Sequence, residues 1–491
     1  MAKIKLRKEP RLDVKYQAFS YQAEAVKTIK DLDYAAIFHE QGLGKSKIAI
    51  DLMLYWLETK KIDTVLFVVK KGLVRNWERE LATHTFIKPK IITQNQRANY
   101  YAFNAPSRLM ITHFEVLISE FERFKLFLKA RDVAVIVDES AKIKNPDSTL
   151  TKVFFALAPL FKKRIIMTGT PVANRPYDIW AQIWFLDQGE SLGNDFNKFK
   201  CDADLSNDLA DNQKMREEFE DTVESIFHRI AHFSVREIKN SGIIELPQKV
   251  IKTVQVDWEK NQYNLYRLVK EEMRAAVIQE GIPTEDNAEP VLKRLLRLVQ
   301  IASNPRLVDE SYHSSPGKLE ILEDIVSDIC RKGEKCIVWS SFTQNVDWLS
   351  NHLSTFGSCS VHGKHNIDRR NKAIDQFLND PEVHVFVATP QSAKEGLTLT
   401  VSNHVIFYDR TFSLDDYLQS QDRIHRISQK KTCYVYNLTM INSIDEWIDV
   451  LLKTKQLAAQ LAQGDISLEF YRSQISYDFG AIIRNILGIC K

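Results

Sequence analysis

The chain has 491 residues, of which 44% are hydrophobic and 27% charged, a composition typical of a globular protein with room for two or three domains. Its 67 Lys and Arg residues nearly balance its 64 Asp and Glu residues, which leaves a net charge of +3. This balance excludes binding to nucleic acid through overall basicity, so any phosphate-binding surface has to be local.

The first eight residues are basic but lack the apolar core of a signal peptide, and no apolar run reaches transmembrane length. The six cysteines are scattered, without a C-x-x-C pair. This pattern is more typical of free thiols in a reducing compartment than of zinc ligands or disulfides. We therefore expect a cytoplasmic protein without membrane contact, in the host cytoplasm if the source is viral.

A helical pattern begins near Phe19 and carries Gln22 shortly before a glycine turn. An aromatic residue followed by Gln at this place suits an adenine, which the ring stacks on and the Gln side chain hydrogen-bonds. An amphipathic helix with a solvated Gln explains the pattern equally well, so the segment alone leaves both interpretations open.

The turn itself, Gly42-Leu43-Gly44-Lys45-Ser46, separates an apolar strand-like run (33–38) from a strongly helical run (47–58). Glycines let backbone N–H groups approach a phosphate closely, and the helix N-terminus adds its positive dipole end. In such a turn Lys45 reaches the outer phosphates and the Ser46 hydroxyl ligates Mg²⁺. The alternative is a tight structural turn, and His39 stands where the general pattern has its first glycine.

Further runs with strand character come next, separated by helical stretches: Thr64 to Val69, Leu109 to Thr112, Val133 to Val137 and Arg164 to Met167. Continuously apolar strands that alternate with helices predict a parallel sheet covered on both faces. Ligands of such sheets gather at the carboxyl ends of the strands.

One of these strand ends carries two acids, Asp138 and Glu139. Two carboxylates directly after a buried strand are costly unless something compensates their charge. A Mg²⁺ ion beside the phosphates would do so, with Asp138 on the metal and Glu139 polarising the attacking water. A solvated Asp-Glu turn is the alternative, and the preceding glycine turn in the same sheet favours the metal.

The second half repeats the alternation, with strands expected at Cys336 to Trp339, Val383 to Ala388, His404 to Tyr408 and Tyr434 to Leu438. It contains no second glycine phosphate loop, so we expect it to supply residues to the first site. In Gln419-Ser420-Gln421-Asp422-Arg423-Ile424-His425-Arg426 the two arginines lie three apart. On a helix they would share one face and point together at a γ-phosphate. The alternative is a surface helix with charge pairs.

Taken together, these motifs resemble those of the Swi/Snf family of helicase-like DNA translocases. The segments that carry the resemblance are Gln22, the glycine turn, Lys71 to Glu80, Asp138-Glu139-Ser140 with Lys144-Asn145, Thr168 to Asn174, Glu395 to Thr400 and Gln419 to Gln429. The chain departs from the family pattern at His39-Glu40-Gln41, at Ser140-Ala141 in place of Ala-His, and at Ser428 in place of Gly.

The resemblance implies an α/β fold of two RecA-like, doubly wound parallel-sheet lobes with helical insertions between them. Lobe 1 is expected at residues 1–240, with a helical insertion at about 177–240. Lobe 2 is expected at 241–450, with a helical protrusion at about 257–312, and a helical brace at 451–491.

The resemblance also implies that ATP and Mg²⁺ bind between the lobes. Nucleotide-binding residues would be Gln22, Gly42, Leu43, Gly44, Lys45, Ser46, Gly396 and Gln419. Catalytic residues would be Lys45, Glu139, Arg423 and Arg426, and Ser46 and Asp138 would hold the metal.

The implied function is a DNA-stimulated ATPase that translocates on double-stranded DNA through sequence-independent phosphate contacts and remodels protein–DNA or DNA structures. A strand-separating DNA or RNA helicase, or the motor subunit of a restriction, defence or repair complex, are the alternatives. The compact chain suits a bacterial or viral source.

Overall fold

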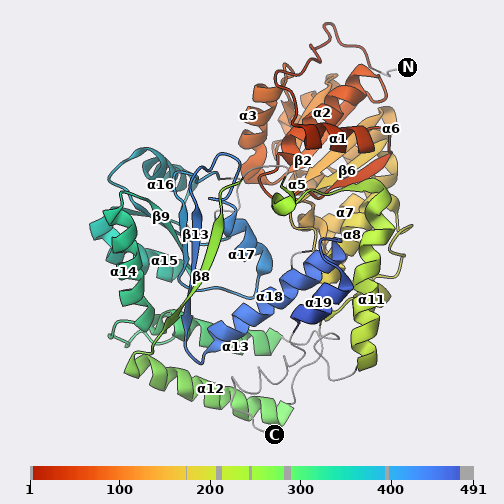
Figure 1. Cartoon of the computed structure of the whole chain (residues 1–491). Coiled ribbons are helices and arrows are strands. Elements are labelled where there is room, and N and C mark those ends of the chain that lie inside the picture. The colour runs from red at the N-terminus through yellow and green to blue at the C-terminus, as the bar shows by residue number, and fades with distance from the viewer. Residues whose placement is uncertain are drawn as a thin grey trace. The chain divides into compact units, whose positions relative to one another are not determined.

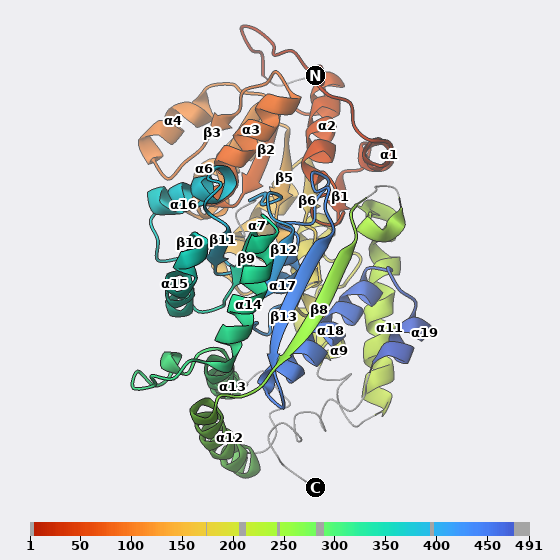
Figure 2. The same cartoon turned by 60° about the vertical axis from the view of Figure 1, so that its left-hand side comes forward.

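The computed structural model describes residues 4–172, 174–205, 213–242, 246–280, 289–392 and 397–475. The chain forms two compact units, each built around its own sheet (Figures 1 and 2). Unit 1 comprises Met1–Asp204, Asp221–Ile244 and Ala459–Asp465, and unit 2 comprises Leu205–Glu220, Glu245–Ala458 and Ile466–Lys491. Among the described helices, none combines the length and apolar character that a membrane span needs.

The sheet of unit 1 has seven strands in the order β3-β4-β2-β5-β6-β1-β7, and every pair is parallel. The strands are β1 (Tyr34–Ile37), β2 (Thr64–Val69), β3 (Lys90–Ile91), β4 (Leu109–His113), β5 (Val133–Asp138), β6 (Lys163–Met167) and β7 (Ser234–Val235). The five strands expected from the sequence are confirmed. The two missed strands, β3 and β7, have two residues each, too few to show an apolar run.

Helices connect these strands: α1 (Ser20–Ile29), α2 (Lys45–Glu58), α3 (Val74–His84), α4 (Gln96–Asn104), α5 (Phe114–Ser119), α6 (Phe121–Ala130), α7 (Thr149–Leu157), α8 (Trp180–Asp187) and α9 (Phe196–Asp202). Alternate strand residues such as Ile37, Phe67 and Ile136 join one apolar cluster with side chains of α1, α2 and α3. The intervening residues, for example Leu66 and Val135, are also fully buried. Burial of both faces is what a continuously apolar parallel strand predicts.

The sheet of unit 2 has six strands in the order β10-β11-β9-β12-β13-β8, again with every pair parallel. The strands are β8 (Lys249–Val256), β9 (Cys336–Trp339), β10 (Ser358–Val361), β11 (Val385–Ala388), β12 (His404–Phe407) and β13 (Cys433–Met440). The expected class, two α/β units with parallel sheets, is confirmed. The edge strand β10 was not expected, because its alternation of Ser and apolar residues is only four residues long.

The helices of unit 2 include α12 (Lys260–Glu280), α13 (Glu289–Ser303), α14 (Gly317–Arg331), α15 (Thr343–His352), α16 (Ile367–Asn379), α17 (Leu414–Gln421) and α19 (Leu468–Gln474). Side chains of α13, α14 and α15 join one face of the sheet in an apolar cluster, and those of α16 join the other face. Two helices, α11 (Gln213–Ile230) and α18 (Ile444–Ala462), contain residues of both units.

A buried polar centre ties together the carboxyl ends of β9 and β12. Asp409, which is 1% exposed, accepts hydrogen bonds from the hydroxyls of Ser340 at 2.6 Å and Ser303 at 2.7 Å. Its other oxygen accepts the N–H of Ser341 at 2.7 Å. A carboxylate with three donors is well satisfied, so the loops at this edge of the sheet are held in fixed positions.

Near this centre lies a buried ion pair between Lys318 of α14 and Asp445 of α18. The Lys318 Nζ lies 2.6 Å from Asp445 Oδ2, and the two side chains are 0% and 3% exposed. Lys318 also donates to the carbonyl of Tyr408 at 3.0 Å. Both charges depend on this geometry, because removal of one leaves the other buried without compensation.

We therefore expect Lys318→Met to lower the free energy of unfolding by about 3–5 kcal/mol, the usual cost of breaking a buried pair. Urea unfolding of the full chain, followed by circular dichroism, measures the change. Arg331→Met is the matched control on the same helix, since Arg331 pairs with Asp328 at the surface. A Lys318→Met chain as stable as the Arg331→Met chain would show that the buried pair is dispensable.

Candidate functional site

The glycine turn lies at the carboxyl end of β1 and runs directly into α2. Gly42 and Gly44 have φ angles of 88° and 72°, the left-handed region that glycine adopts without strain. Gly44 is the N-cap of α2 and offers no side chain to the first helical turn. The N-terminal end of a helix favours an anion, through its first backbone N–H groups and the positive end of the helix dipole.

Lys45, the first residue of α2, folds back over the turn. Its Nζ donates to the carbonyls of His39 at 2.8 Å and Glu40 at 3.2 Å. Gly169, in the turn after β6, comes so close that an added Cβ would lie 3.2 Å from this Nζ and 2.8 Å from Gln41 Cγ. The turns after β1 and β6 thus pack against each other around the lysine.

Gln22 lies behind the glycine turn and not in solvent. Its side chain is 3% exposed, and its Nε2 donates to the carbonyl of Leu43 at 3.3 Å and to the Tyr21 hydroxyl at 3.2 Å. A Cβ on Gly44 would approach this Nε2 to 2.3 Å. The interpretation of a solvated Gln is therefore wrong, and contact of Gln22 with an adenine stays a prediction.

His39 is a buried residue beneath the same turn, 2% exposed. Burial, together with the charge of Lys45, lowers the pKa of His39 to about 4. The ring is therefore neutral at pH 7 and stacks on Tyr21, with the ring centroids 6.1 Å apart. Where the general pattern has a glycine, this chain has an uncharged ring that supports the turn.

The acidic pair lies at the end of β5, which shares the neighbour β6 with β1. Asp138 is the last residue of β5, and its Oδ2 accepts the indole N–H of Trp77 at 2.8 Å. Glu139 has a φ of 57°, a conformation that costs a non-glycine residue energy and aims the next turn away from the strand. The strand and this backbone bend set the two carboxylates at the same edge as the glycine turn.

Two side chains join Glu139 to its surroundings. Gln41 of the glycine turn donates to Glu139 Oε1 at 3.3 Å, and the Nζ of Lys70, directly after β2, lies 3.7 Å from Oε2. Sequence reasoning missed Gln41 and Lys70. The signal for Lys70 was its place after an apolar strand, at the edge where ligands gather.

Electrostatics at this edge favour an additional cation. Burial, and then the neighbouring charge of Glu139, raise the pKa of Asp138 to about 6, although Trp77, Lys45 and Lys70 oppose the shift. The two lysines therefore compensate the pair only in part. Carboxylate and hydroxyl oxygens are the ligands that Mg²⁺ prefers, so Asp138, with Ser46 as the second residue of α2, fits the predicted metal role.

Ser140, where the Swi/Snf pattern has Ala, connects the acidic turn to the turn after β6. Its hydroxyl donates to Gln182 Oε1 at 2.7 Å, and the Nε2 of Gln182 donates to the carbonyl of Pro171 at 3.0 Å. Ser140 and Gln182 are both fully buried. These hydrogen bonds lie within unit 1 and join the acidic turn to the turn after β6.

The remaining predicted residues lie in unit 2. Gln419 on α17 is buried and donates to Asp415 at 2.7 Å. Arg423 is 2% exposed and donates to the carbonyl of Leu397 at 3.3 Å. Arg426 is half-buried and donates to the carbonyl of Asp422 and to the Thr398 hydroxyl, both at 2.8 Å. Gly396 lies outside the described residues.

The prediction that Arg423 and Arg426 share a helical face is wrong. Helix α17 ends at Gln421, and both arginines lie in the turns after it. The segment is held by tertiary hydrogen bonds, among them Leu399 N–H to the Arg423 carbonyl at 3.0 Å and Gln429 Nε2 to the Ser402 carbonyl at 2.9 Å. These bonds come from residues distant in the sequence, so the spacing of the two arginines does not reveal them.

The raised pKa of Asp138 yields a test on stability. An acid whose pKa rises on folding keeps a proton that the unfolded chain has lost, so stability falls as the pH rises from about 4 through about 6. Asp138→Asn removes this loss and still accepts the Trp77 N–H. We expect the variant to be more stable than wild type by about 1–3 kcal/mol at pH 7.5, and by less at pH 5.

Thermal unfolding at both pH values measures the difference. Asp147→Asn is the control, because it makes the same change of charge at an exposed position nearby. The same stability for Asp138→Asn and wild type at pH 7.5 would mean that the acidic pair is not strained.

Two protein-family models match successive parts of this chain. Residues 21–307 match the model of the SNF2-related domain, and residues 317–428 match that of the helicase conserved C-terminal domain. An ATP-dependent helicase of Mycoplasma genitalium is 26% identical over 89% of this chain and 41% of its own length. The ISWI chromatin-remodeling complex ATPase ISW2 of Saccharomyces cerevisiae is 26% identical over 83% of this chain and 37% of its own length.

The chain thus spans about two fifths of the length of these relatives. Among solved structures, the Sulfolobus solfataricus SWI2/SNF2 ATPase core in complex with double-stranded DNA is 23% identical, with a TM-score of 0.42, and the match covers 95% of this chain and 98% of that one.

Proposed function

The chain belongs to the family of the SNF2-related domain, joined here to a helicase conserved C-terminal domain, and from that membership we propose that it hydrolyses ATP to move along double-stranded DNA. The names of its relatives, ATP-dependent helicase and chromatin-remodeling ATPase, support the use of ATP. Movement along duplex DNA is the finer part of the proposal and rests on the family alone.

One observation carries the ATPase proposal: the contact of Gln41 with Glu139. In this contact the glycine turn, the proposed phosphate site, adjoins the carboxylate that is the candidate base. Lys45 and the bent backbone at Glu139 complete a set that has an anion site, a cation for the outer phosphates and a proton acceptor. A glycine turn with only a structural role would require neither the two adjacent carboxylates nor the strained backbone at Glu139.

The positions of these residues define the proposed steps of ATP hydrolysis. Backbone N–H groups of residues 42–46 hold the triphosphate, and Lys45 leaves the His39 and Glu40 carbonyls for the outer phosphates. Glu139 orients a water molecule and takes its proton as the oxygen attacks the γ-phosphorus, while the bond to the β-phosphate oxygen breaks and ADP leaves. Mg²⁺, when held by Ser46 and Asp138, neutralises charge on the phosphates.

The roles of Arg423 and Arg426 stay predictions. A guanidinium that approaches the γ-phosphate would stabilise the charge that spreads over its oxygens. Arg426 is the better exposed of the two, so it suits this role better than Arg423.

We expect Glu139→Gln to lower the turnover of ATP by about 10²–10⁴-fold, the usual contribution of a positioned base. Binding of ATP is retained, because the amide keeps the shape of the side chain and the turn is unchanged. Steady-state hydrolysis and fluorescent-nucleotide titration separate the two effects. Glu58→Gln, at the exposed end of α2, is the control. Wild-type turnover in Glu139→Gln would remove Glu139 from the mechanism.

The proposal as a whole is tested by ATP hydrolysis measured side by side with no nucleic acid, single-stranded DNA, duplex DNA and RNA. We expect duplex DNA to stimulate ATP turnover most. This stimulation should fall steeply as the salt concentration rises, because the protein contacts the DNA phosphates. Lys45→Ala is the inactive control.

Triplex displacement by the wild-type chain, without strand separation on a forked substrate, is the expected result for a duplex translocase. Strand separation on the fork would favour a helicase instead. Hydrolysis that no nucleic acid stimulates would contradict a nucleic-acid motor for the chain on its own.

A further inference from the structure

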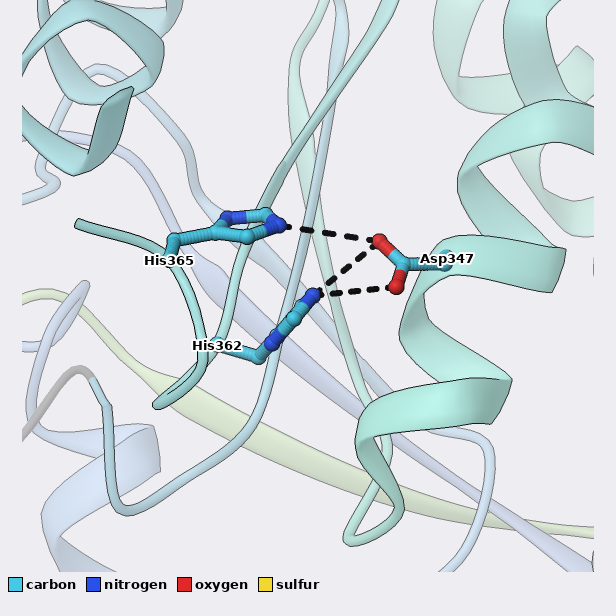
Figure 3. A group of neighbouring side chains, drawn as sticks. All are labelled: Asp347, His362 and His365. Atoms are coloured by element: carbon cyan, nitrogen blue, oxygen red, sulfur yellow. Dashed lines mark hydrogen bonds and ion pairs between the residues drawn. The ribbon is translucent and has the colours of Figure 1, made fainter.

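A second cluster of titratable side chains lies in unit 2 and has no part in the proposed ATPase chemistry. Asp347 belongs to α15, His362 directly follows β10, and His365 lies in the loop before α16. Among the described residues, these three form the one group of His, Cys, Asp or Glu side chains that is placed to hold a metal ion. Their ligand atoms all lie within 4.8 Å of one another. Figure 3 shows both rings turned with Nε2 toward the carboxylate.

The separations between the ligand atoms of this cluster can be compared with those in a zinc site. Nε2 of His362 lies 3.0 Å from Asp347 Oδ2, and Nε2 of His365 lies 3.7 Å from Asp347 Oδ1. Two atoms bound tetrahedrally to one zinc ion at its usual bond lengths are roughly 3.3–3.5 Å apart. The two separations bracket this range. The ring centroids of His362 and His365 lie 3.7 Å apart, so the two rings have to rotate away from each other for both to bind one ion.

Hydrogen bonding explains His362 but not His365. Both rings are buried, 3% and 8% exposed. Yet neither ring nitrogen of His365 makes a hydrogen bond of ordinary length and angle among the residues that the structure describes, since its interactions with the Ser360 backbone and with Asp347 are long or poorly aligned. Such incomplete hydrogen bonding is costly for a buried polar group. Imidazole binds metals in its neutral form, through a ring nitrogen that carries no proton.

We propose that Asp347, His362 and His365 form a binding site for a divalent transition metal, with zinc as the expected ion. Two imidazoles and one carboxylate are a ligand set typical of zinc, whereas Mg²⁺ prefers oxygen ligands only. Three protein ligands leave one position open. The Asp347 side chain is 49% exposed, so water reaches the cluster from that side and can fill the open position.

Binding requires a change of tautomer at His362. In the structure its Nε2 donates to Asp347, while Nδ1 accepts the N–H of Lys364 at 3.3 Å. The metal takes the place of the Nε2 proton, which moves to Nδ1 through solvent, and the long bond from Lys364 is lost. Acid weakens binding, since protonated rings cannot act as ligands.

The bound metal would fasten the loop between β10 and α16 to α15. Gly363 of this loop lines a cavity of about 270 Å³, together with Ser341, Arg370 and Thr389. The metal therefore stiffens one wall of this cavity. A ligand that binds only the folded chain also raises its thermal stability, so zinc should raise the midpoint of unfolding.

The test is equilibrium dialysis of the full chain, first stripped with EDTA, against Zn²⁺ in excess Mg²⁺, with bound metal measured by elemental analysis. We expect one zinc per wild-type chain and at least tenfold weaker binding in His365→Gln and in Asp347→Asn. Cobalt supplies a second readout, because a tetrahedral Co²⁺ site absorbs visible light, and this absorption should be lost in both variants.

Two controls should keep the site. His352→Ala removes an exposed histidine from the same helix, and Cys201→Ser removes an exposed thiol that could bind zinc elsewhere. Circular dichroism confirms that each variant is folded. A wild-type chain that binds no zinc above the level of His365→Gln, or variants that bind as wild type does, would overturn the proposal and leave a hydrogen-bonded Asp–His pair. Neither result depends on ATP hydrolysis.

Discussion

Two adjacent carboxylates at the end of a buried strand are the constraint around which unit 1 is arranged. Asp138 and Glu139 repel each other where little water screens them. Three side chains from other elements compensate them in part: Gln41 from the turn after β1, Lys70 from the end of β2, and Trp77 from α3. The arrangement positions the glycine turn and the acidic pair, and it leaves room for further positive charge.

Much of this arrangement was predictable from the sequence. Parallel strands buried on both faces are continuously apolar, so β2, β5 and β9 stand out without any tertiary information. The turns after β1 and β5 were predictable as well. Two glycines at the end of one strand and two adjacent acids at the end of another each indicate a binding or catalytic role. Local sequence patterns therefore predict most strands of both sheets and the residues at the carboxyl ends of these strands.

Tertiary contacts account for what the sequence did not reveal. The spacing of Arg423 and Arg426 indicated a helix, but bonds to residues 397–402, far away in the sequence, hold the segment in turns. From the sequence, the Gln22 side chain is expected either in solvent or in contact with a ligand. Only the packing shows that it donates a hydrogen bond to the Leu43 carbonyl. The His362 cluster was not predicted, because Asp347 lies 15 residues before His362 in the sequence and two nearby histidines alone do not indicate a metal site.

The account depends most on the binding of a triphosphate by the glycine turn beside the acidic pair. Hydrogen–deuterium exchange of the full chain, with and without Mg²⁺ and a non-hydrolysable ATP analogue, tests this directly. The account predicts slower exchange of the amides in residues 41–47, absent in a Lys45→Ala chain. Unchanged exchange in these residues at saturating analogue, with protection only elsewhere in the chain, would contradict it.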